Sequence, residues 1–362
     1  MRHLQHHFPA GRPVLILAPM QDVTDLPFWE LAHAYGGPDI YFTEYFRVHP
    51  NSVPDRKILQ CLRRHPTGKP AIAQMIGQSI PDLVRTAQRL QQEQIIALDL
   101  NVGCPAPIVC RKSAGGGLLR HLDHLDAILG ALRRAVDIPL TVKTRIGFND
   151  PEELDGILDV ILSHDVDMLT LHGRTVKEMY RAHVHYDRIR HAVERVGGRF
   201  PVIANGNVLN ASGARDILRQ TGAAGLMIGR GCIRNPWIWN QIRETFTNAI
   251  METRPTLRDL RVYVEQLYQH TRPAGLPEKL HIAKMKKYMN FVAQGIGEDD
   301  GFVQGIRRAQ SEAEFFALCD LYLDRDGDFD GEPLAGALVN AGNPRTECHR
   351  RTPRFTSPLT VT

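Results

Sequence analysis

The chain has 362 residues, 43% of them hydrophobic, and a formal net charge of +4 at pH 7. This is enough apolar content for one or two domains with a large core, while the charge is too weak to identify a polyanionic partner by itself. No apolar run reaches the ~18 residues of a membrane helix, and the six cysteines lack metal-ligand spacing, so we expect a cytoplasmic protein with reduced thiols and neither a membrane contact nor a required metal.

Apolar runs alternate with stretches of helical spacing over the first 250 residues. The predicted strands are residues 14–20, 40–46, 71–76, 95–102, 140–146, 168–172, 201–204 and 225–228. The clearest helices between them are residues 81–92, 122–136, 151–163 and 211–220. Strands that alternate with helices indicate a parallel sheet, and eight such runs in ~230 residues predict a closed (β/α)8 TIM barrel over residues 1–250.

The composition changes near Pro255, and no strand-like run follows. Residues 257–268, 278–292 and 310–322 have helical spacing, which predicts a small all-helical domain over residues 251–325. Residues 326–362 are polar and rich in Gly and Pro, which predicts a disordered tail. This tail begins like a calcium-binding loop, but Ala337 stands where the bidentate carboxylate belongs, so we expect no calcium site.

The segment Leu98-Asp-Leu-Asn-Val-Gly-Cys-Pro105 carries the most informative chemistry of the chain. Asn101 and Cys104 lie where a buried strand ends and a Gly-rich loop begins. Active sites of (β/α)8 barrels form at the carboxyl ends of the strands. A thiol between Gly103 and Pro105 at such a position is displayed rather than packed, so Cys104 is a candidate catalytic residue.

Other strand ends carry groups that suit a flat, anionic cofactor. Ala18-Pro-Met20 ends the first run, Gln74 the third and His172 the sixth. Gln74 has an amide that can both donate and accept hydrogen bonds. Lys143 places an ammonium group inside a barrel strand, where burial costs several kcal/mol unless an anion compensates. Taken singly, each of these residues also fits a structural role.

The last two strands end in sequences typical of a phosphate site. Asn205, Gly206 and Asn207 follow the seventh strand, and Gly229 and Arg230 follow the eighth. Glycines let the backbone approach a ligand closely, and successive N–H groups bind phosphate well. The loops after strands seven and eight are the usual phosphate site of this barrel.

In order and spacing, these motifs resemble those of the tRNA-dihydrouridine synthases over about residues 14–325. The resemblance implies FMN bound by Ala18, Pro19, Met20, Gln74, Lys143, His172, Asn205, Gly206, Asn207, Gly229 and Arg230. It implies that flavin N5 gives hydride to C6 of a uracil and that Cys104 protonates C5. Asn101 and Arg145 are then expected near the target base.

The resemblance also implies NADPH as the reductant. No Gly-x-Gly-x-x-Gly opens a helix, so we expect NADPH to bind directly over the flavin and to leave before RNA enters. The chain departs from the resemblance at Gly116-Gly117, where Ala or Ser is expected. The sequence leaves open which uridine is reduced and whether NADH also serves; we expect a monomer.

Contacts with tRNA are predicted on both parts of the chain. Tyr180, on a long loop, is placed to stack on a base, and Lys284, Lys286 and Lys287 are placed to hold phosphates. A solvated helix face has the same pattern. Two alternatives stay open: a flavoenzyme that acts on a small pyrimidine, such as a dihydroorotate or dihydropyrimidine dehydrogenase, and a tRNA-binding protein without catalysis.

Overall fold

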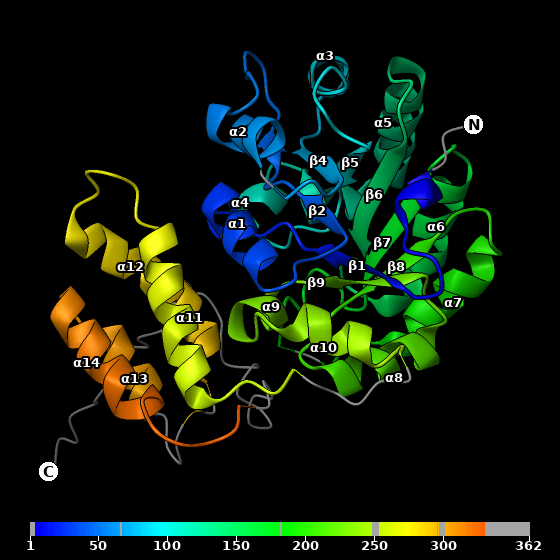
Figure 1. Cartoon of the computed structure of the whole chain (residues 1–362). Helices are drawn as coiled ribbons and strands as arrows, with labels where there is room; N and C mark the ends of the chain where they lie inside the picture. Colours follow the sequence, from blue (N-terminus) through cyan, green and yellow to red (C-terminus); the bar gives the residue numbers. More distant parts are fainter. Residues whose placement is uncertain are drawn as a thin grey trace, which may run out of the picture.

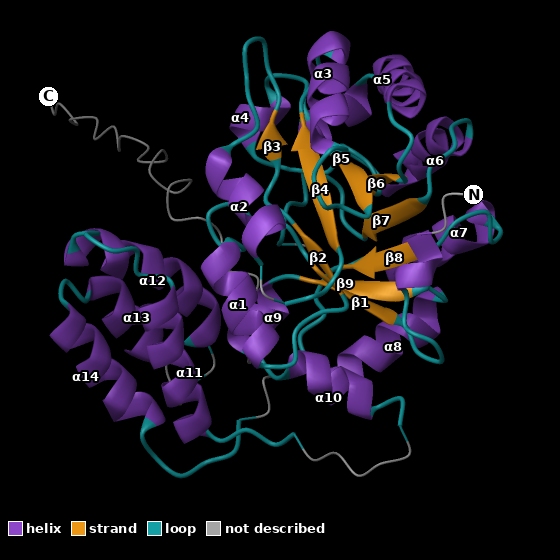
Figure 2. Cartoon of the chain, turned by 45° about the horizontal axis from the view of Figure 1, so that its top comes forward, coloured by secondary structure: helices purple, strands orange, loops and turns teal. Residues whose placement is uncertain are grey.

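The computed structural model describes residues 4–65, 67–181, 183–247, 253–294, 296 and 301–329. Eight parallel strands close into a barrel in which β9 pairs again with β1, as Figure 1 and Figure 2 show. The strands are β1 Val14–Leu17, β2 Ile40–Phe42, β4 Ala71–Ile76, β5 Ala97–Asn101, β6 Leu140–Arg145, β7 Met168–His172, β8 Val202–Asn205 and β9 Gly225–Ile228. The predicted TIM barrel is confirmed.

The predicted strand over residues 40–46 is divided in the structure. It consists of β2 and of a separate two-residue strand, β3 (Phe46–Arg47), which pairs with β4. Between them, the hydroxyl oxygen of Thr43 accepts a hydrogen bond from the backbone N–H of Gln74 at 3.1 Å. A side-chain oxygen therefore takes the place of a ladder carbonyl, which interrupts the strand.

Helices cover the outside of the barrel. The longer ones are α1 Leu26–Ala34, α2 Arg56–Arg64, α3 Ile80–Leu90, α5 Leu122–Ala135, α6 Leu154–Leu162, α7 Tyr186–Val196 and α8 Ala211–Thr221. The shorter ones are α4 Pro107–Cys110, α9 Arg230–Arg234, α10 Ile238–Glu244 and the 3-10 helices η1 Leu4–His7, η2 Gly115–Arg120 and η3 Pro151–Glu153. The four predicted barrel helices are confirmed as α3, α5, α6 and α8. Helices α1, α2 and α7 are additional to these four.

Inside the barrel, inward-facing residues change from apolar to polar along β4 and β5. Ile72 and Ala97 belong to an apolar cluster near the amino ends of β4 and β5. Two residues further along each strand, on the same face, stand Gln74 and Asp99. Polar groups therefore gather at the carboxyl end of the barrel, where active sites of this fold form.

Four further helices stand beside the barrel in Figure 2: α11 Leu257–His270, α12 Glu278–Val292, α13 Gly301–Arg308 and α14 Glu312–Leu323. The predicted helices over 257–268, 278–292 and 310–322 are thus confirmed, and α13 is additional. Helix α11 packs against α1, and α12 packs against α9. Buried residues of these helices, such as Tyr263 and Tyr288, belong to the same hydrophobic core as the outer face of the barrel.

The chain returns to the start of this helical segment after α14. Thr256 and Asp328 form an antiparallel bridge, and the N–H of Phe329 donates to the carbonyl of Pro255 at 2.9 Å. The prediction of disorder is therefore wrong for residues 326–329, because the buried ring of Phe329 anchors them. The rest of the predicted tail, residues 330–362, lies outside the described residues.

The described residues can be searched for a membrane-spanning helix and for a metal site. Within them, no helix has the length and apolar character needed to cross a membrane. The same residues hold no group of three or more His, Cys, Asp or Glu side chains arranged to bind a metal ion.

Candidate active site

A chain of buried hydrogen bonds crosses the carboxyl end of the barrel. The hydroxyl of Thr141 donates to Oδ1 of Asp99 at 2.6 Å, and Nε2 of Gln74 donates to Oδ2 at 2.8 Å. Nδ2 of Asn101 in turn donates to Oε1 of Gln74 at 2.8 Å. Asp99 therefore fixes which way the Gln74 amide points, and Gln74 fixes Asn101.

Asn101 connects this chain of hydrogen bonds to the cysteine loop. Its Oδ1 accepts hydrogen bonds from the N–H groups of Gly103 at 3.1 Å and Cys104 at 2.9 Å. The loop is thus capped by a side chain whose other end is held inside the barrel. The predicted contact of Asn101 with uracil stays a prediction, whereas its hydrogen bonds make it a positioning residue for Cys104.

The Gly-rich segment wraps around the carbonyl of Cys104. This oxygen accepts from the N–H of Gly116 at 3.0 Å and from the thiol of Cys110 at 3.4 Å. A Cβ added at Gly116 would lie 2.9 Å from the Cys104 oxygen, and one at Gly117 would lie 2.6 Å from the Cys110 oxygen. The departure from Ala or Ser at these positions therefore has a steric cause, because the backbones approach too closely for a side chain.

Two ionisable groups, the buried Asp99 and the partly buried Lys143, lie on the neighbouring strands β5 and β6. Burial raises the pKa of Asp99 to about 6, although hydrogen bonds from Thr141 and Gln74 favour its charged form. Burial also lowers the pKa of Lys143 to about 8, with repulsion from Arg145 as a second cause. Nζ of Lys143 lies 3.3 Å from Oδ1 of Asn205, so these two predicted cofactor residues meet in the barrel mouth.

Cations crowd the barrel mouth around His172. Burial lowers the pKa of His172 well below its usual value, and Arg145, Lys143, Arg174 and Arg230 lower it further by repulsion. The ring is therefore neutral, and its buried Nδ1 has no hydrogen-bond partner among the described residues. So many cations with an unpaired ring nitrogen fit an anionic ligand that compensates the charge and supplies the missing partner.

The loops after β7, β8 and β9 bring two arginines to one amide. Oδ1 of Asn207 lies 3.3 Å from Nη2 of Arg174 and 3.3 Å from Nη2 of Arg230. Asn207 and Gly206 have φ angles of 47° and 133°, in the region that favours glycine and asparagine. The predicted phosphate site thus gains a second arginine, Arg174 from the loop after β7, which the sequence analysis does not single out although it follows His172 by only two residues.

The end of β1 meets the end of β9 as predicted. The N–H of Ala18 donates to the carbonyl of Ile228 at 2.8 Å. A Cβ added at Gly229 would lie 3.3 Å from Sδ of Met20 and 3.4 Å from Cβ of Ala18. Strand pairing therefore brings the segment Ala18-Pro-Met20 next to the predicted phosphate loop.

Arg145 serves as a strut between two loops. Its Nε donates to the carbonyl of Gly103 at 2.9 Å, and its Nη1 donates to the carbonyls of Thr175 at 3.0 Å and Met179 at 2.8 Å. The guanidinium is almost fully buried and much of its donor capacity is used inside the protein. Its predicted contact with uracil stays a prediction beside this structural role.

Tyr180 lies over the cation cluster. Its ring centroid is 5.2 Å from the guanidinium carbon of Arg145 and 5.0 Å from that of Arg230, and the ring is 6.2 Å from that of His172. The side chain nevertheless remains 41% exposed. A flat aromatic ring that is partly open to solvent at the barrel mouth is suited to stack on a base.

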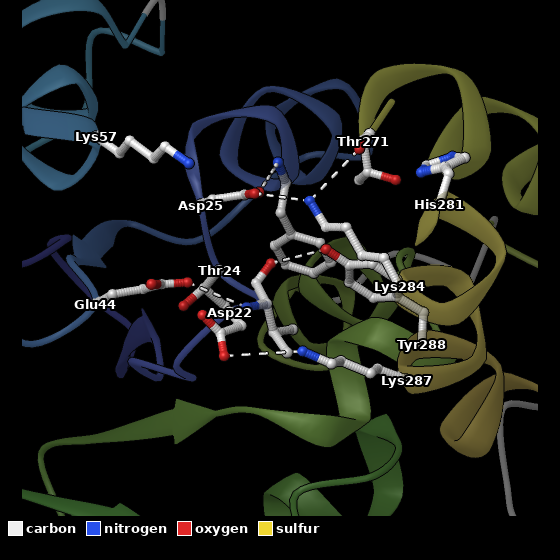
Figure 3. A network of polar contacts seen from close by, with 12 residues as sticks. Asp22, Thr24, Asp25, Glu44, Lys57, Thr271, His281, Lys284, Lys287 and Tyr288 are labelled. Carbon is white, nitrogen blue, oxygen red and sulfur yellow. Dashed lines mark hydrogen bonds and ion pairs between the residues drawn. The ribbon is translucent and has the colours of Figure 1, made fainter. Parts of the chain in front are cut away.

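Of the predicted lysines on α12, two are paired with the loop that follows β1 (Figure 3). Nζ of Lys284 lies 2.9 Å from Oδ2 of Asp25, and Nζ of Lys287 lies 3.8 Å from Oδ2 of Asp22. Lys284 is therefore committed first to joining α12 to α1, which weakens its prediction as a tRNA contact. Lys287 is exposed and its longer pair leaves it available to an external phosphate.

Glu44 supports the same loop from the barrel side. Its carboxylate accepts hydrogen bonds from Nε2 of Gln21 at 3.0 Å and from the N–H of Val23 at 3.1 Å. The hydroxyl of Tyr288, from α12, donates to the carbonyl of Val23 at 3.1 Å. The sequence analysis does not single out Glu44 or Asp99, although a carboxylate inside an otherwise apolar strand is a signal that would find Asp99.

Comparisons with known proteins agree with this geometry. A family model described as "Dihydrouridine synthase (Dus)" matches residues 16–322. The chain is 32% identical to tRNA-dihydrouridine synthase B of Klebsiella pneumoniae over 317 residues, which cover 86% of this chain and 96% of that protein. It is 39% identical to tRNA-dihydrouridine synthase B of Vibrio vulnificus (strain CMCP6) over 240 residues, which cover 65% of this chain and 72% of that protein. It is 36% identical over 231 residues, 63% of this chain and 69% of the relative, to a probable tRNA-dihydrouridine synthase of Rickettsia prowazekii (strain Madrid E).

Proposed function

The chain belongs to the dihydrouridine synthase family. We propose that it reduces uridine in tRNA with bound FMN, that NADPH is the reductant and that Cys104 is the proton donor. The observation that carries this proposal is the cation cluster of the barrel mouth next to the cysteine loop. It surrounds Nδ1 of His172, which has no hydrogen-bond partner within the described part of the chain. The proposed residues therefore provide an anion site and a thiol at the same barrel end.

FMN fits the donors that the barrel mouth offers. Arg174 and Arg230, together with the loop of Gly206 and Asn207, are suited to its phosphate because arginine forks and backbone N–H groups bind phosphate well. Lys143 and His172 are suited to the ring. The proposed contacts further include Ala18, Pro19, Met20, Gln74, Asn205 and Gly229. When bound, FMN supplies the hydride that reduces C6 of the uracil.

Cys104 supplies the proton that completes the reduction at C5. The thiol sits on a loop that is held from three sides: Asn101 caps its N–H groups, Gly116 binds its carbonyl, and Arg145 binds the carbonyl of Gly103. A general acid works best when its position is fixed before the substrate arrives. Rigid support of the loop is consistent with this task.

The substrate in this proposal is a uridine of tRNA that has left its helix. Only a single base can enter a barrel mouth, so the target must be flipped out of the RNA. Tyr180 is available to stack on it, and Lys286 and Lys287 are proposed to hold phosphates on α12. The described residues form one barrel and four further helices, none of which is a separate dinucleotide-binding sheet, so NADPH is proposed to bind over the flavin.

Two half-reactions test the proposal on purified protein under anaerobic conditions. With NADPH, the flavin absorbance of Cys104→Ala should bleach at the parental rate, because the thiol acts only on the substrate. With tRNA, reoxidation should slow by roughly 10²–10⁴-fold, the usual range for a missing general acid. Cys61→Ser is the matched control, since Cys61 lies buried on α2.

Three outcomes contradict the proposal. If the purified protein neither carries FMN nor takes it up on titration, FMN is not its cofactor. Reoxidation of Cys104→Ala as fast as the parent removes the thiol as the acid. Reoxidation of the reduced flavin by an unsaturated free pyrimidine, such as uracil or orotate, as fast as by tRNA favours the small-molecule flavoenzyme instead.

A further inference from the structure

A cavity of about 300 Å³ lies on the rim of the barrel beside the cysteine loop. Pro105, the residue after Cys104, forms part of its wall. Phe148 comes from the loop after β6, and Val176 and Met179 come from the loop after β7. This is the lower end of the range for pockets that bind small ligands, and it is large enough for one flat ring.

The cavity is held open by bonds within the protein. The N–H groups of Val176 and Lys177 donate to the carbonyls of Gly147 and Phe148 at 2.9 and 3.0 Å, which joins the loops after β6 and β7. Arg145 joins the second of these loops to Gly103 of the cysteine loop. Its walls are therefore the loops that position Cys104, and no rearrangement is needed to form it.

The charge around the cavity has one sign. Arg111, Arg120 and Lys177 line it, and among the described residues no acidic side chain does. The guanidinium of Arg120 lies 4.7 Å from the ring centroid of Phe148, and its Nη2 donates to the carbonyl of Cys110 at 2.8 Å. Proteins bind unpaired RNA bases by stacking them on aromatic rings or on the planes of arginine side chains, with lysine and arginine at the phosphates.

We propose that this cavity takes the base of the nucleotide next to the target uridine, while Arg111 and Lys177 bind the adjoining phosphates. The inference rests on the proposed function, because it places the target base in the barrel mouth beside Cys104. When an RNA strand delivers one flipped nucleotide to the barrel mouth, the nucleotides on either side of it must pass over the rim. The cavity opens on that rim, and Pro105, the residue after Cys104, lines it. The adenine of NADPH is the competing occupant, and the test separates the two.

The first experiment is a double-mutant cycle that combines a change in the enzyme with a change in the tRNA. Parent and Phe148→Ala are titrated with tRNA and with two versions that lack the base on the 5′ or the 3′ side of the target uridine, a position mapped beforehand with the parent. For the parent, one of the two abasic tRNAs should bind roughly 5- to 100-fold more weakly, the range that one stacked base contributes. For Phe148→Ala, the same abasic change should have less than a third of that effect. Phe246→Ala, an aromatic residue beyond α10 that is 38% exposed, is the control.

The second experiment removes the charge of the rim and does not depend on catalysis. Arg111→Glu and Lys177→Glu should each weaken tRNA binding at least fivefold, leave FMN content unchanged and leave the KM for NADPH in flavin reduction unchanged. Lys69→Glu, an exposed change in the loop before β4 at the opposite end of the barrel, should leave all three unchanged.

The outcomes distinguish this inference from the proposed function. A parent that binds tRNA but forms no dihydrouridine contradicts the proposed function, and the rim variants still decide whether the cavity binds RNA. Abasic effects that are the same in parent and Phe148→Ala overturn the inference while leaving the activity intact. A raised KM for NADPH with unchanged tRNA affinity also overturns it, because the cavity then holds the dinucleotide.

Discussion

Nζ of Lys284 lies 2.9 Å from Oδ2 of Asp25, across 259 positions of the sequence. Asp25 is also the N-cap of α1, where its Oδ1 accepts from the N–H of Phe28 at 3.3 Å. One carboxylate thus begins a barrel helix and holds α12. The ring of Tyr288, one turn after Lys284, stacks on Phe28 with centroids 6.0 Å apart, so the ion pair and an aromatic pair fix the same contact.

The Lys284–Asp25 pair should stabilise the fold through this contact. Both side chains are partly exposed, so a double-mutant cycle of Lys284→Met and Asp25→Asn should give a coupling free energy of about 0.5–1 kcal/mol in urea unfolding. Asn at position 25 keeps the N-cap and removes only the charge. A coupling near zero would mean that the packing of Tyr288 holds α12 without the pair.

Affinity for tRNA should depend on Lys286 and Lys287, which are less tightly paired with the barrel than Lys284 is. Replacing Lys286 and Lys287 by Gln removes charge from α12, so tRNA binding should weaken and its dependence on salt should become shallower by roughly one unit for each phosphate that the variant no longer binds. Binding is measured from 50 to 200 mM salt with Lys69→Gln as the control. An unchanged salt slope would identify this surface of α12 as merely solvated.

Retention of FMN should depend on the paired arginines at Asn207. Arg230→Ala removes a charge-assisted hydrogen bond to the phosphate, which is worth about 1.5–3 kcal/mol, so the Kd for FMN should rise roughly 10- to 100-fold. Fluorescence titration of the apoprotein measures it. Arg219→Ala, on the exposed face of α8, should change nothing. Equal affinities in Arg230→Ala and the parent would place the phosphate elsewhere.

Glu44 should make the fold less stable as pH rises. Burial, together with repulsion from Asp25 and Asp22, raises its pKa from the usual 4.5 to about 7. Between these two values the folded protein holds a proton that the unfolded chain releases, so the contribution of Glu44 to stability falls as pH rises through this window. Relative to the parent, Glu44→Gln should therefore gain stability between pH 5 and pH 8, on the order of 3 kcal/mol.

Urea unfolding at both pH values measures this difference. The control is Glu265→Gln, a change at a carboxylate on the outer part of α11 that is half exposed. A free-energy difference between Glu44→Gln and the parent that is the same at pH 5 and pH 8 would show that Glu44 does not titrate in this range.

The sequence predicts where functional side chains stand better than which partners they meet. Gln74, Lys143 and His172 each lie in the carboxyl-terminal half of a strand, and parallel strands in one barrel must bring these halves together, so their common location follows from the strand pattern alone. Their partners depend on register. Asp99 reaches Gln74 because these two residues are directly paired across β4 and β5, which no local pattern contains.

Long-range pairs are beyond sequence patterns for the same reason. Lys284 looks like any lysine on an exposed helix face until α12 is placed against the loop after β1. Arg145 looks like a ligand-binding arginine until the carbonyls of Gly103 and Met179 are in place around it. The sequence shows that both residues are charged, but the groups that pair with them come from other parts of the fold.

The bridge between Thr256 and Asp328 means that the helical segment begins and ends at one place. Its entrance and exit are about 5 Å apart, the usual distance between paired residues of antiparallel strands. Helices α11–α14 follow every strand of the barrel, and within the described residues the chain does not return to the barrel after them. A single connection, just before Thr256, therefore joins the bundle to the barrel, so exchange of the whole bundle would require one new join and would leave the order of the strands unchanged.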